Sequence, residues 1–202
     1  MQQTVLFREF EDRDVDFIYK CKNDEKLNSM VVGQFHPYSY DDAKKWVEGC
    51  KGEHDTYKFW AICTNDSEKR IVGWCSLSKI DKVNQSASFH GIVIADKLYH
   101  DGFAWIESYC FIMKYVFEVL GLNRMYSDSI VGHKQSNIAT HLFLYTIEGV
   151  LREAIIKNGK KYDIRLTSIL KDEYFRNKDN GEYELKTILK RLRYLKTCLK
   201  KT

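Results

Sequence analysis

The stretch that most constrains the fold is residues 86–120, which join a β-branched segment, a polar loop and a long apolar segment. Residues 89–95 are apolar and rich in branched side chains, which predicts a buried strand. The polar residues 96–101 predict a turn, and residues 103–120 are apolar over the length of a helix. A strand that leads through Gly102 into a helix N-terminus directs several free backbone N–H groups at one point, which suits a phosphate or pyrophosphate. Many strand-to-helix turns offer part of such a site, so this stretch alone does not decide the function.

The loop itself resembles a known cofactor motif. Residues 99–104 read Tyr-His-Asp-Gly-Phe-Ala, and the acetyl-coenzyme A loop of the GNAT N-acetyltransferases reads Gln/Arg-x-x-Gly-x-Gly/Ala. Gly102 and Ala104 match that motif, whereas Tyr99 stands in place of its first residue.

A second region strengthens the resemblance. The family pattern there is N-x-x-S, then L-G-F, then x-E-G-x-L-R, followed by a closing D-x-x-x-x-S-x-L-x-x-E strand. His133 stands where Asn is usual and Leu144 where Gly is usual. The residues that match in register are Ser136, Glu148, Gly149, Leu151, Arg152, Ser168, Leu170 and Glu173. The resemblance covers residues 4–176 and is closest to the branch of ribosomal-protein alanine, polyamine and nucleotide-amino-sugar acetyltransferases.

The resemblance implies an α+β (α/β/α) GNAT fold. Its central sheet would be mixed but mostly antiparallel, with six to seven strands, a splay between strands 4 and 5, and helices on both sides. Acetyl-coenzyme A would be the co-substrate, with its pantetheine in the splay as a false extra strand and its pyrophosphate on the backbone of residues 100–104. The cofactor-binding residues implied are Ile92, Val93, Ile94, Tyr99, His100, Asp101, Gly102, Phe103, Ala104, His133 and Ser136.

Acetyl transfer to an amine needs a neutral amine, a hydrogen-bond donor for the thioester oxygen and a proton for the departing thiolate. Many relatives supply that proton from a Tyr, but the equivalent position here is Thr140. We therefore consider Ser136 and His133 as catalytic candidates, against the alternative that they only begin a helix. His90 is a third candidate, because it lies where relatives often place a carboxylate that relays a proton. The alternative for His90 is a hydrogen-bonded histidine of the core.

The acceptor is indicated only by residues 30–40, which contain no acidic residue. In the family the corresponding loop forms a wall of the acceptor site, and the candidate substrate-binding residues are Phe35, His36, Tyr38 and Tyr40. Aromatic rings suit stacking on a sugar or nucleobase, but they are equally suited to fixing the loop on the core. We expect a small-molecule amine, first an amino sugar or nucleotide-linked amino sugar. The alternatives are a protein N-terminus, a polyamine, and an acyl-coenzyme A binding domain without catalysis.

Composition sets the remaining limits. A chain of 202 residues is long enough for one core and short for two. The six cysteines include no Cys-x-x-Cys pair, so we expect free thiols, a cytoplasmic location and no metal site. A net charge of +4 does not single out nucleic acid, and no apolar run reaches membrane-spanning length without charge.

Residues 177–202 lie outside the family pattern. They predict a basic amphipathic helix with leucines and Ile188 on one face. Such a helix can bind an anionic membrane or nucleic acid, but we expect it to dock on residues 1–176 or on a second copy in a homodimer.

Overall fold

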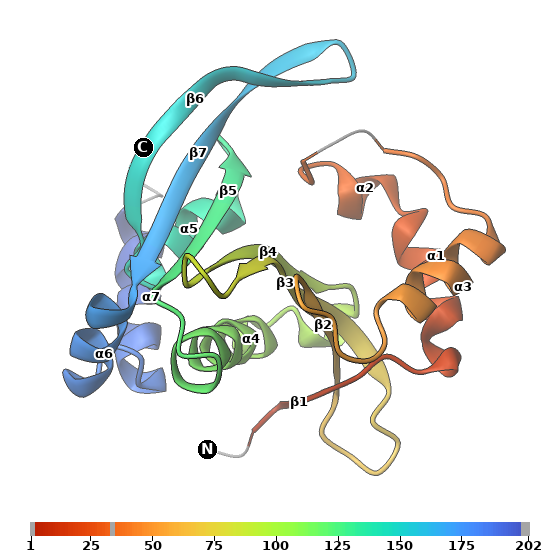
Figure 1. The fold of residues 1–202 in the computed structure, drawn as a ribbon, viewed down its shortest axis with the longest axis horizontal. Helices are drawn as coiled ribbons and strands as arrows, with labels where there is room; N and C mark the ends of the chain where they lie inside the picture. Colours follow the sequence, from red (N-terminus) through yellow and green to blue (C-terminus); the bar gives the residue numbers. More distant parts are fainter. Residues whose placement is uncertain (1–2, 33–34, 199–202) are drawn as a thin grey trace.

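A seven-stranded mixed sheet organises the molecule (Figure 1). The computed structural model describes residues 3–32 and 35–198. The strand order is β1-β2-β3-β4-β5-β7-β6, in which β4 and β5 are parallel and all other neighbours are antiparallel. The strands are β1 (Val5–Arg8), β2 (Lys58–Thr64), β3 (Ile71–Asp81), β4 (Ser86–Ile94), β5 (Arg124–Ile130), β6 (Thr146–Lys157) and β7 (Lys160–Leu170). The predicted mixed, mostly antiparallel sheet is confirmed.

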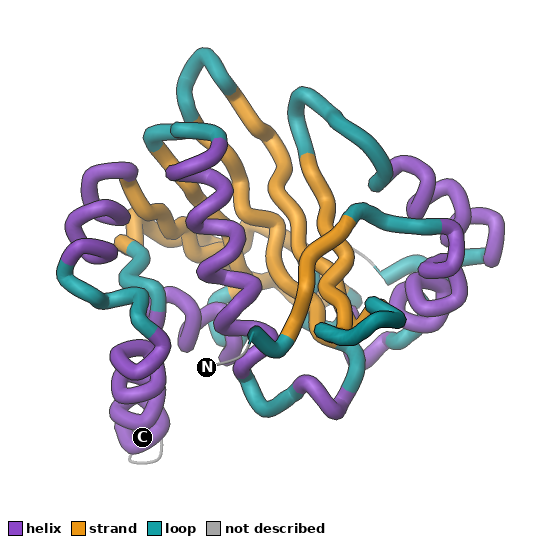
Figure 2. The backbone as a smooth tube through the Cα atoms, turned by 90° about the horizontal axis from the view of Figure 1, so that it is seen from below, coloured by secondary structure: helices purple, strands orange, loops and turns teal. Residues whose placement is uncertain are grey.

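Helices cover both faces of this sheet (Figure 2). One hydrophobic cluster packs α1 (Val15–Lys22) and α3 (Tyr40–Gly49) on one face, where the short α2 (Glu25–Asn28) also contacts α1. A second cluster packs the other helices on the opposite face. These are α4 (Phe103–Lys114), α5 (Lys134–Leu142), α6 (Lys171–Asp179) and α7 (Leu185–Cys198). Helices α4 and α5 thus lie on one face of the sheet, and the layer of α1, α2 and α3 lies on the other. The expected splay between β4 and β5 lies between these two layers.

Local sequence signals explain several element ends. Ser39 and Asp42 form a reciprocal capping box at the start of α3. Gly121 takes a left-handed conformation after the long helix, with φ +65°. Gly73 lies so close to β4 that a Cβ there would meet the carbonyl oxygen of Val93 at 2.1 Å. A Gly between Val72 and Trp74 is typical of a bulge or of a close backbone approach, and the structure has both: the close approach at Gly73 and a bulge at the adjacent Val72 in the pairing of β3 with β2.

The long helix and the last hairpin differ from expectation. The predicted helix 103–120 is α-helical only to Lys114 and continues as a π-helical turn, Tyr115–Val119. Strands β6 and β7 continue to a turn between Lys157 and Lys160, so the β6–β7 hairpin extends beyond the residues that face the core. Hydrophobic periodicity marks the residues that face a core, and most of β6 is exposed, which explains why its full length was not predicted.

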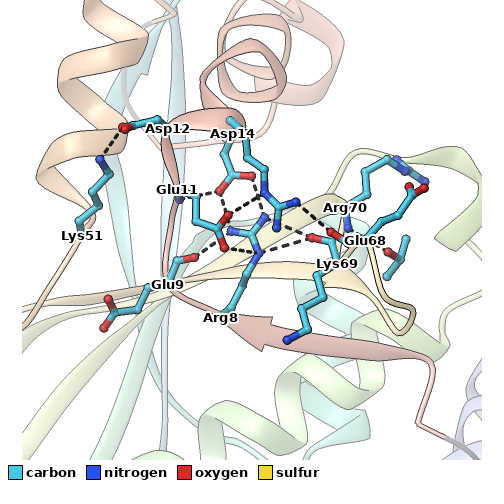
Figure 3. A network of polar contacts seen from close by, with 11 residues as sticks. Arg8, Glu9, Glu11, Asp12, Asp14, Lys51, Glu68, Lys69 and Arg70 are labelled. Atoms are coloured by element: carbon cyan, nitrogen blue, oxygen red, sulfur yellow. Dashed lines mark hydrogen bonds and ion pairs between the residues drawn. The ribbon is translucent and has the colours of Figure 1, made fainter.

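A polar network fixes the first helical layer to the sheet (Figure 3). Arg8 on β1 donates to both carboxylate oxygens of the buried Asp14, at 2.7 and 2.8 Å, and to the carbonyl of Lys69 in the β2–β3 turn at 3.2 Å. Arg13 donates to the carbonyl of Glu68 in the same turn at 3.0 Å. Asp14 immediately precedes α1. The network therefore fixes the start of α1 on the sheet, and with it the position of the residues that follow the helix.

Helix α7 packs on the sheet's second face through its apolar side. Ile188 is fully buried, and Leu185, Leu189, Leu192 and Leu195 pack against the same cluster. Arg191 donates to the carbonyl of Leu142, the last residue of α5, at 2.5 Å. This arrangement corresponds to the first expected alternative, in which the helix docks on residues 1–176.

Candidate active site

Strands β4 and β5 pair over a short distance and then separate. Their register has three residue pairs, from Ser86 with Arg124 to Ser88 with Tyr126. Just beyond, His90 is an extra residue in β4, because Phe89 pairs with Leu77 and Gly91 with Ser76 on β3. Gly91 has φ +113°, which a residue with a side chain rarely adopts. A bulge of this kind turns a strand, and the expected splay between strands 4 and 5 follows it.

The separation leaves backbone groups of β4 without a strand partner. The N–H of Ala95 donates to the carbonyl of Val72 on β3 at 2.9 Å. Groups of alternate residues face the same neighbouring strand, so the N–H and C=O groups of Ile92 and Ile94 face the side that β5 has left. The Ile94 carbonyl oxygen lies 3.0 Å from Nε2 of His100, which agrees with this orientation. The N–H groups of Ile92 and Ile94 are thus available to a carbonyl placed in the gap.

The predicted cofactor loop begins where β4 ends. Asp96 accepts from the N–H of Leu98 at 3.0 Å and pairs with Arg70 at 2.8 Å, which fixes the start of the loop to the β2–β3 turn. These contacts and the guanidinium of Arg70 hold the pKa of Asp96 below its usual value against the effect of burial. Tyr99 packs partly against the α4-side core.

The start of α4 has the shape expected of an anion site. Gly102 is the N-cap residue with φ +98°, a conformation that disfavours any side chain. Asp101 fills part of the site itself, because its Oδ1 accepts from the N–H of Phe103 at 2.9 Å. Ala104, by contrast, is buried in the core. A phosphate bound at this helix N-terminus would have to displace the Asp101 carboxylate from the N–H of Phe103.

His133 and Ser136 lie together at the start of α5. His133 is the N-cap residue, and its Nδ1 lies 2.5 Å from the Ser136 hydroxyl oxygen. Burial lowers the pKa of His133, which favours the neutral ring. Thr140 donates its hydroxyl to the Ser136 carbonyl at 2.9 Å and is buried, so it is not placed to substitute for a catalytic Tyr. Next to Ser136, the buried Oδ1 of Asn137 has no hydrogen-bond partner among the described residues.

His90 is not the hydrogen-bonded core histidine that was its alternative interpretation. Its side chain is exposed at the bulge of β4, where the strand leaves β5. An exposed histidine at this position is open to a substrate, whereas a buried one would need partners of its own.

The four aromatic candidates of the acceptor loop are placed differently. Phe35 is half-buried and His36 is exposed; Gly33 and Gln34 of the same loop lie outside the described residues. Tyr38 is held by Asn23, which accepts from its N–H at 3.0 Å and donates to its carbonyl at 3.1 Å. Tyr40 is already the first residue of α3 and donates its hydroxyl to Asp16 on α1 at 2.7 Å. Tyr38 and Tyr40 therefore serve at least to anchor the loop.

Two lysines next to this loop were not predicted. The ammonium of Lys22 lies 4.5 Å from the Trp46 ring centroid and also faces the rings of Tyr38 and Trp74. Burial lowers the pKa of Lys22. Lys157, at the end of β6, donates to two carbonyls of residues 28–31. Neither lysine belongs to a motif, and their contacts depend on the packing of distant segments.

Several matched family positions have structural roles. The Glu148 carboxylate binds both Arg124 guanidinium nitrogens, at 2.6 and 2.5 Å, and accepts from Ser168 at 2.7 Å. Leu144 has φ +60°, so it adopts the left-handed conformation that a glycine at this position would adopt more easily. The contacts of Glu148 with Arg124 and Ser168 link β5, β6 and β7.

Across residues 3–32 and 35–198, no three histidine, cysteine, aspartate or glutamate side chains come together to hold a metal ion. Within the same part of the chain, no helix has the length and hydropathy needed to span a membrane.

Comparisons with known proteins agree with this geometry. Residues 4–141 match the family model described as the acetyltransferase (GNAT) domain. The chain is 27% identical to the spermidine N(1)-acetyltransferase of Vibrio cholerae over 180 residues, which cover 86% of this chain and 97% of that protein. It is 31% identical to a putative ribosomal N-acetyltransferase of Bacillus subtilis over 105 residues, 52% of this chain and 56% of that protein.

The solved structures show the same fold. A crystal structure of the spermidine N-acetyltransferase from Vibrio cholerae in complex with CoA and spermine superposes with a TM-score of 0.74. Its sequence identity is 23%, and the match covers 86% of this chain and 99% of that one.

Proposed function

Because the chain belongs to the GNAT acetyltransferase family, we propose that it transfers an acetyl group to the primary amine of a small molecule, most favourably an amino sugar or nucleotide-linked amino sugar. Family membership makes it an acetyl-coenzyme A-dependent N-acetyltransferase. The acceptor is the part that this proposal adds.

The residues described above supply the groups that the reaction needs. Acetyl-coenzyme A provides the activated acetyl thioester. The N–H groups of Ile92 and Ile94 are placed to donate to the thioester oxygen as negative charge grows on it. Ser136 can give its hydroxyl proton to the leaving sulfur while Nδ1–H of His133 donates a hydrogen bond to the Ser136 oxygen, and solvent water then returns a proton to Ser136. His90, exposed at the bulge, is available to accept a proton from the amine.

The observation that carries the acceptor assignment is the charge of the acceptor loop. Residues 30–40 contain no carboxylate, and two ammonium groups, those of Lys22 and Lys157, contact the loop or its start. A polyamine carries several positive charges, so it would be repelled by these lysines and would find no carboxylate in the loop. A neutral sugar, or a sugar linked to an anionic nucleotide, avoids this penalty and can stack on Phe35 or His36.

A polyamine is the second candidate, because the relative that matches along 97% of its own length is a spermidine N(1)-acetyltransferase. Steady-state kinetics separate the classes, with spermidine, a nucleotide-linked amino sugar and an N-terminal peptide compared at saturating acetyl-coenzyme A. We expect the amino sugar to have the highest kcat/KM. Spermidine as the best substrate would overturn our assignment, and acetyl-coenzyme A binding without turnover on any amine would favour a non-catalytic binding domain.

A further inference from the structure

Lys157 is an unusual residue in an exposed hairpin. It is the last residue of β6, before the tight turn at Asn158 and Gly159, whose φ values are +51° and +74°. Most of β6 is exposed, yet Lys157 is only 6% exposed. Lysine is rarely buried unless its ammonium is hydrogen-bonded, so the contacts of this side chain deserve an explanation.

Its ammonium joins two segments that are far apart in sequence. Nζ donates to the carbonyl of Val31 at 2.7 Å and to the carbonyl of Asn28 at 3.0 Å. Asn28 is the last residue of α2, and its carbonyl also accepts from the N–H of Val31 at 3.2 Å. No carboxylate in the described part of the chain forms an ion pair with Lys157, so the two carbonyls satisfy the charge, and burial lowers the pKa of the ammonium.

The contact joins the hairpin to the start of the acceptor loop. Figure 1 shows the β6–β7 hairpin reaching across the sheet toward α2. The acceptor loop that follows α2 is held at its other end by the reciprocal bonds between Asn23 and Tyr38. Among the described residues, Lys157 thus provides a polar link between the hairpin tip and the near end of the loop, whose far end is held by Asn23.

We propose that Lys157 is a positioning residue that ties the hairpin to residues 28–31 and thereby sets how tightly the acceptor amine is held. This inference rests on the proposed function, because it assigns the acceptor to the space between the loop and the hairpin. It assigns no contact between Lys157 and acetyl-coenzyme A. Loss of the link therefore affects acceptor binding and leaves cofactor binding unchanged.

The test compares Lys157→Met, which keeps the length of the side chain, with Lys157→Arg, which keeps the donors. Lys160→Met is the matched control, because Lys160 is exposed on the same hairpin and faces the ring of Tyr162. For Lys157→Met we expect the acceptor KM to rise about tenfold, a factor that corresponds to one or two lost hydrogen bonds to a charged group. The Kd of acetyl-coenzyme A by calorimetry should stay within about twofold, Lys157→Arg should restore most of the acceptor KM, and Lys160→Met should behave as the wild type.

Amide hydrogen exchange provides a readout that does not depend on turnover. We expect faster exchange at residues 28–31 and at the hairpin tip in Lys157→Met, with unchanged exchange in α4. A folded Lys157→Met protein with wild-type acceptor KM and wild-type exchange would overturn the proposal, as would an equal rise of KM in Lys160→Met. If the wild type acetylates none of the amines, the proposed function fails and the exchange experiment alone decides whether the link exists.

Discussion

Among the single residues, Ser136 and His133 have the geometry most suited to chemistry, because a hydroxyl and an imidazole lie 2.5 Å apart at the start of α5. If Ser136 protonates the leaving thiolate, Ser136→Ala should lower kcat about 100-fold, within the usual range for loss of a general acid. The Kd of acetyl-coenzyme A should change little. His133→Gln should give a smaller loss, because a glutamine can still donate to the serine. Stopped-flow measurement of thiol release checks this, and a Ser136→Ala enzyme with wild-type kcat would leave the pair with only a structural role.

The sequence predicted these two residues but not the lysines, for a physical reason. His133 and Ser136 are three positions apart in one helix start, so their proximity follows from local geometry. Lys157 meets residues 28 and 31 across more than a hundred positions of chain, and no local pattern encodes that contact. His90 is intermediate: its strand was predictable, but its exposure depends on a bulge that the pairing with β3 creates.

At the scale of elements, the ion pair between Glu148 on β6 and Arg124 on β5 links the two strands that flank β7. The guanidinium and the Ser168 hydroxyl lower the pKa of Glu148 from 4.5 to about 2. A carboxylate with a depressed folded-state pKa stabilises the fold above its unfolded pKa, and this contribution is lost as the pH falls from about 4.5 toward 2.

Glu148→Gln should therefore lower the free energy of unfolding at pH 7 and flatten its decrease between pH 4.5 and 2. Urea denaturation at a series of pH values measures both effects. Glu153→Gln is the control on the same strand, because its partner Lys161 and Glu153 itself are both more than half exposed. Identical pH profiles for wild type and Glu148→Gln would show that this ion pair contributes nothing to acid stability.

The sequence predicted most of the helices and strands, but it did not predict where several of them end. The pattern Ser39-x-x-Asp42 and the pair Asn158-Gly159 are local signals in the sequence, and the structure has a helix cap at the first and a hairpin turn at the second. The π-helical turn after Lys114 and the exposed length of β6 arise from packing and strand pairing, which the sequence pattern of a single segment does not contain.

For the whole molecule, the main question is whether α7 belongs to the same folding unit as residues 1–176. Ile188 is fully buried and Arg191 binds the end of α5, so we infer that α7 completes the core on the α4–α5 face. Ile188→Ala should then lower the free energy of unfolding by about 2–4 kcal/mol, the usual cost of a cavity at a buried isoleucine. Lys186→Ala is the control, since the Lys186 side chain is 85% exposed and its loss should cost less than about 0.5 kcal/mol.

A contact between two copies would give a different result. If α7 mainly joined copies in a homodimer, Ile188→Ala would shift the protein toward monomer in size-exclusion chromatography, and its unfolding midpoint would depend on protein concentration. If α7 is part of the core of each chain, the destabilisation is the same at every protein concentration and both variants elute as the wild type does. Because the buried face of α7 already contacts α5 within one chain, we expect the second result. A concentration-dependent loss of stability in Ile188→Ala would contradict it.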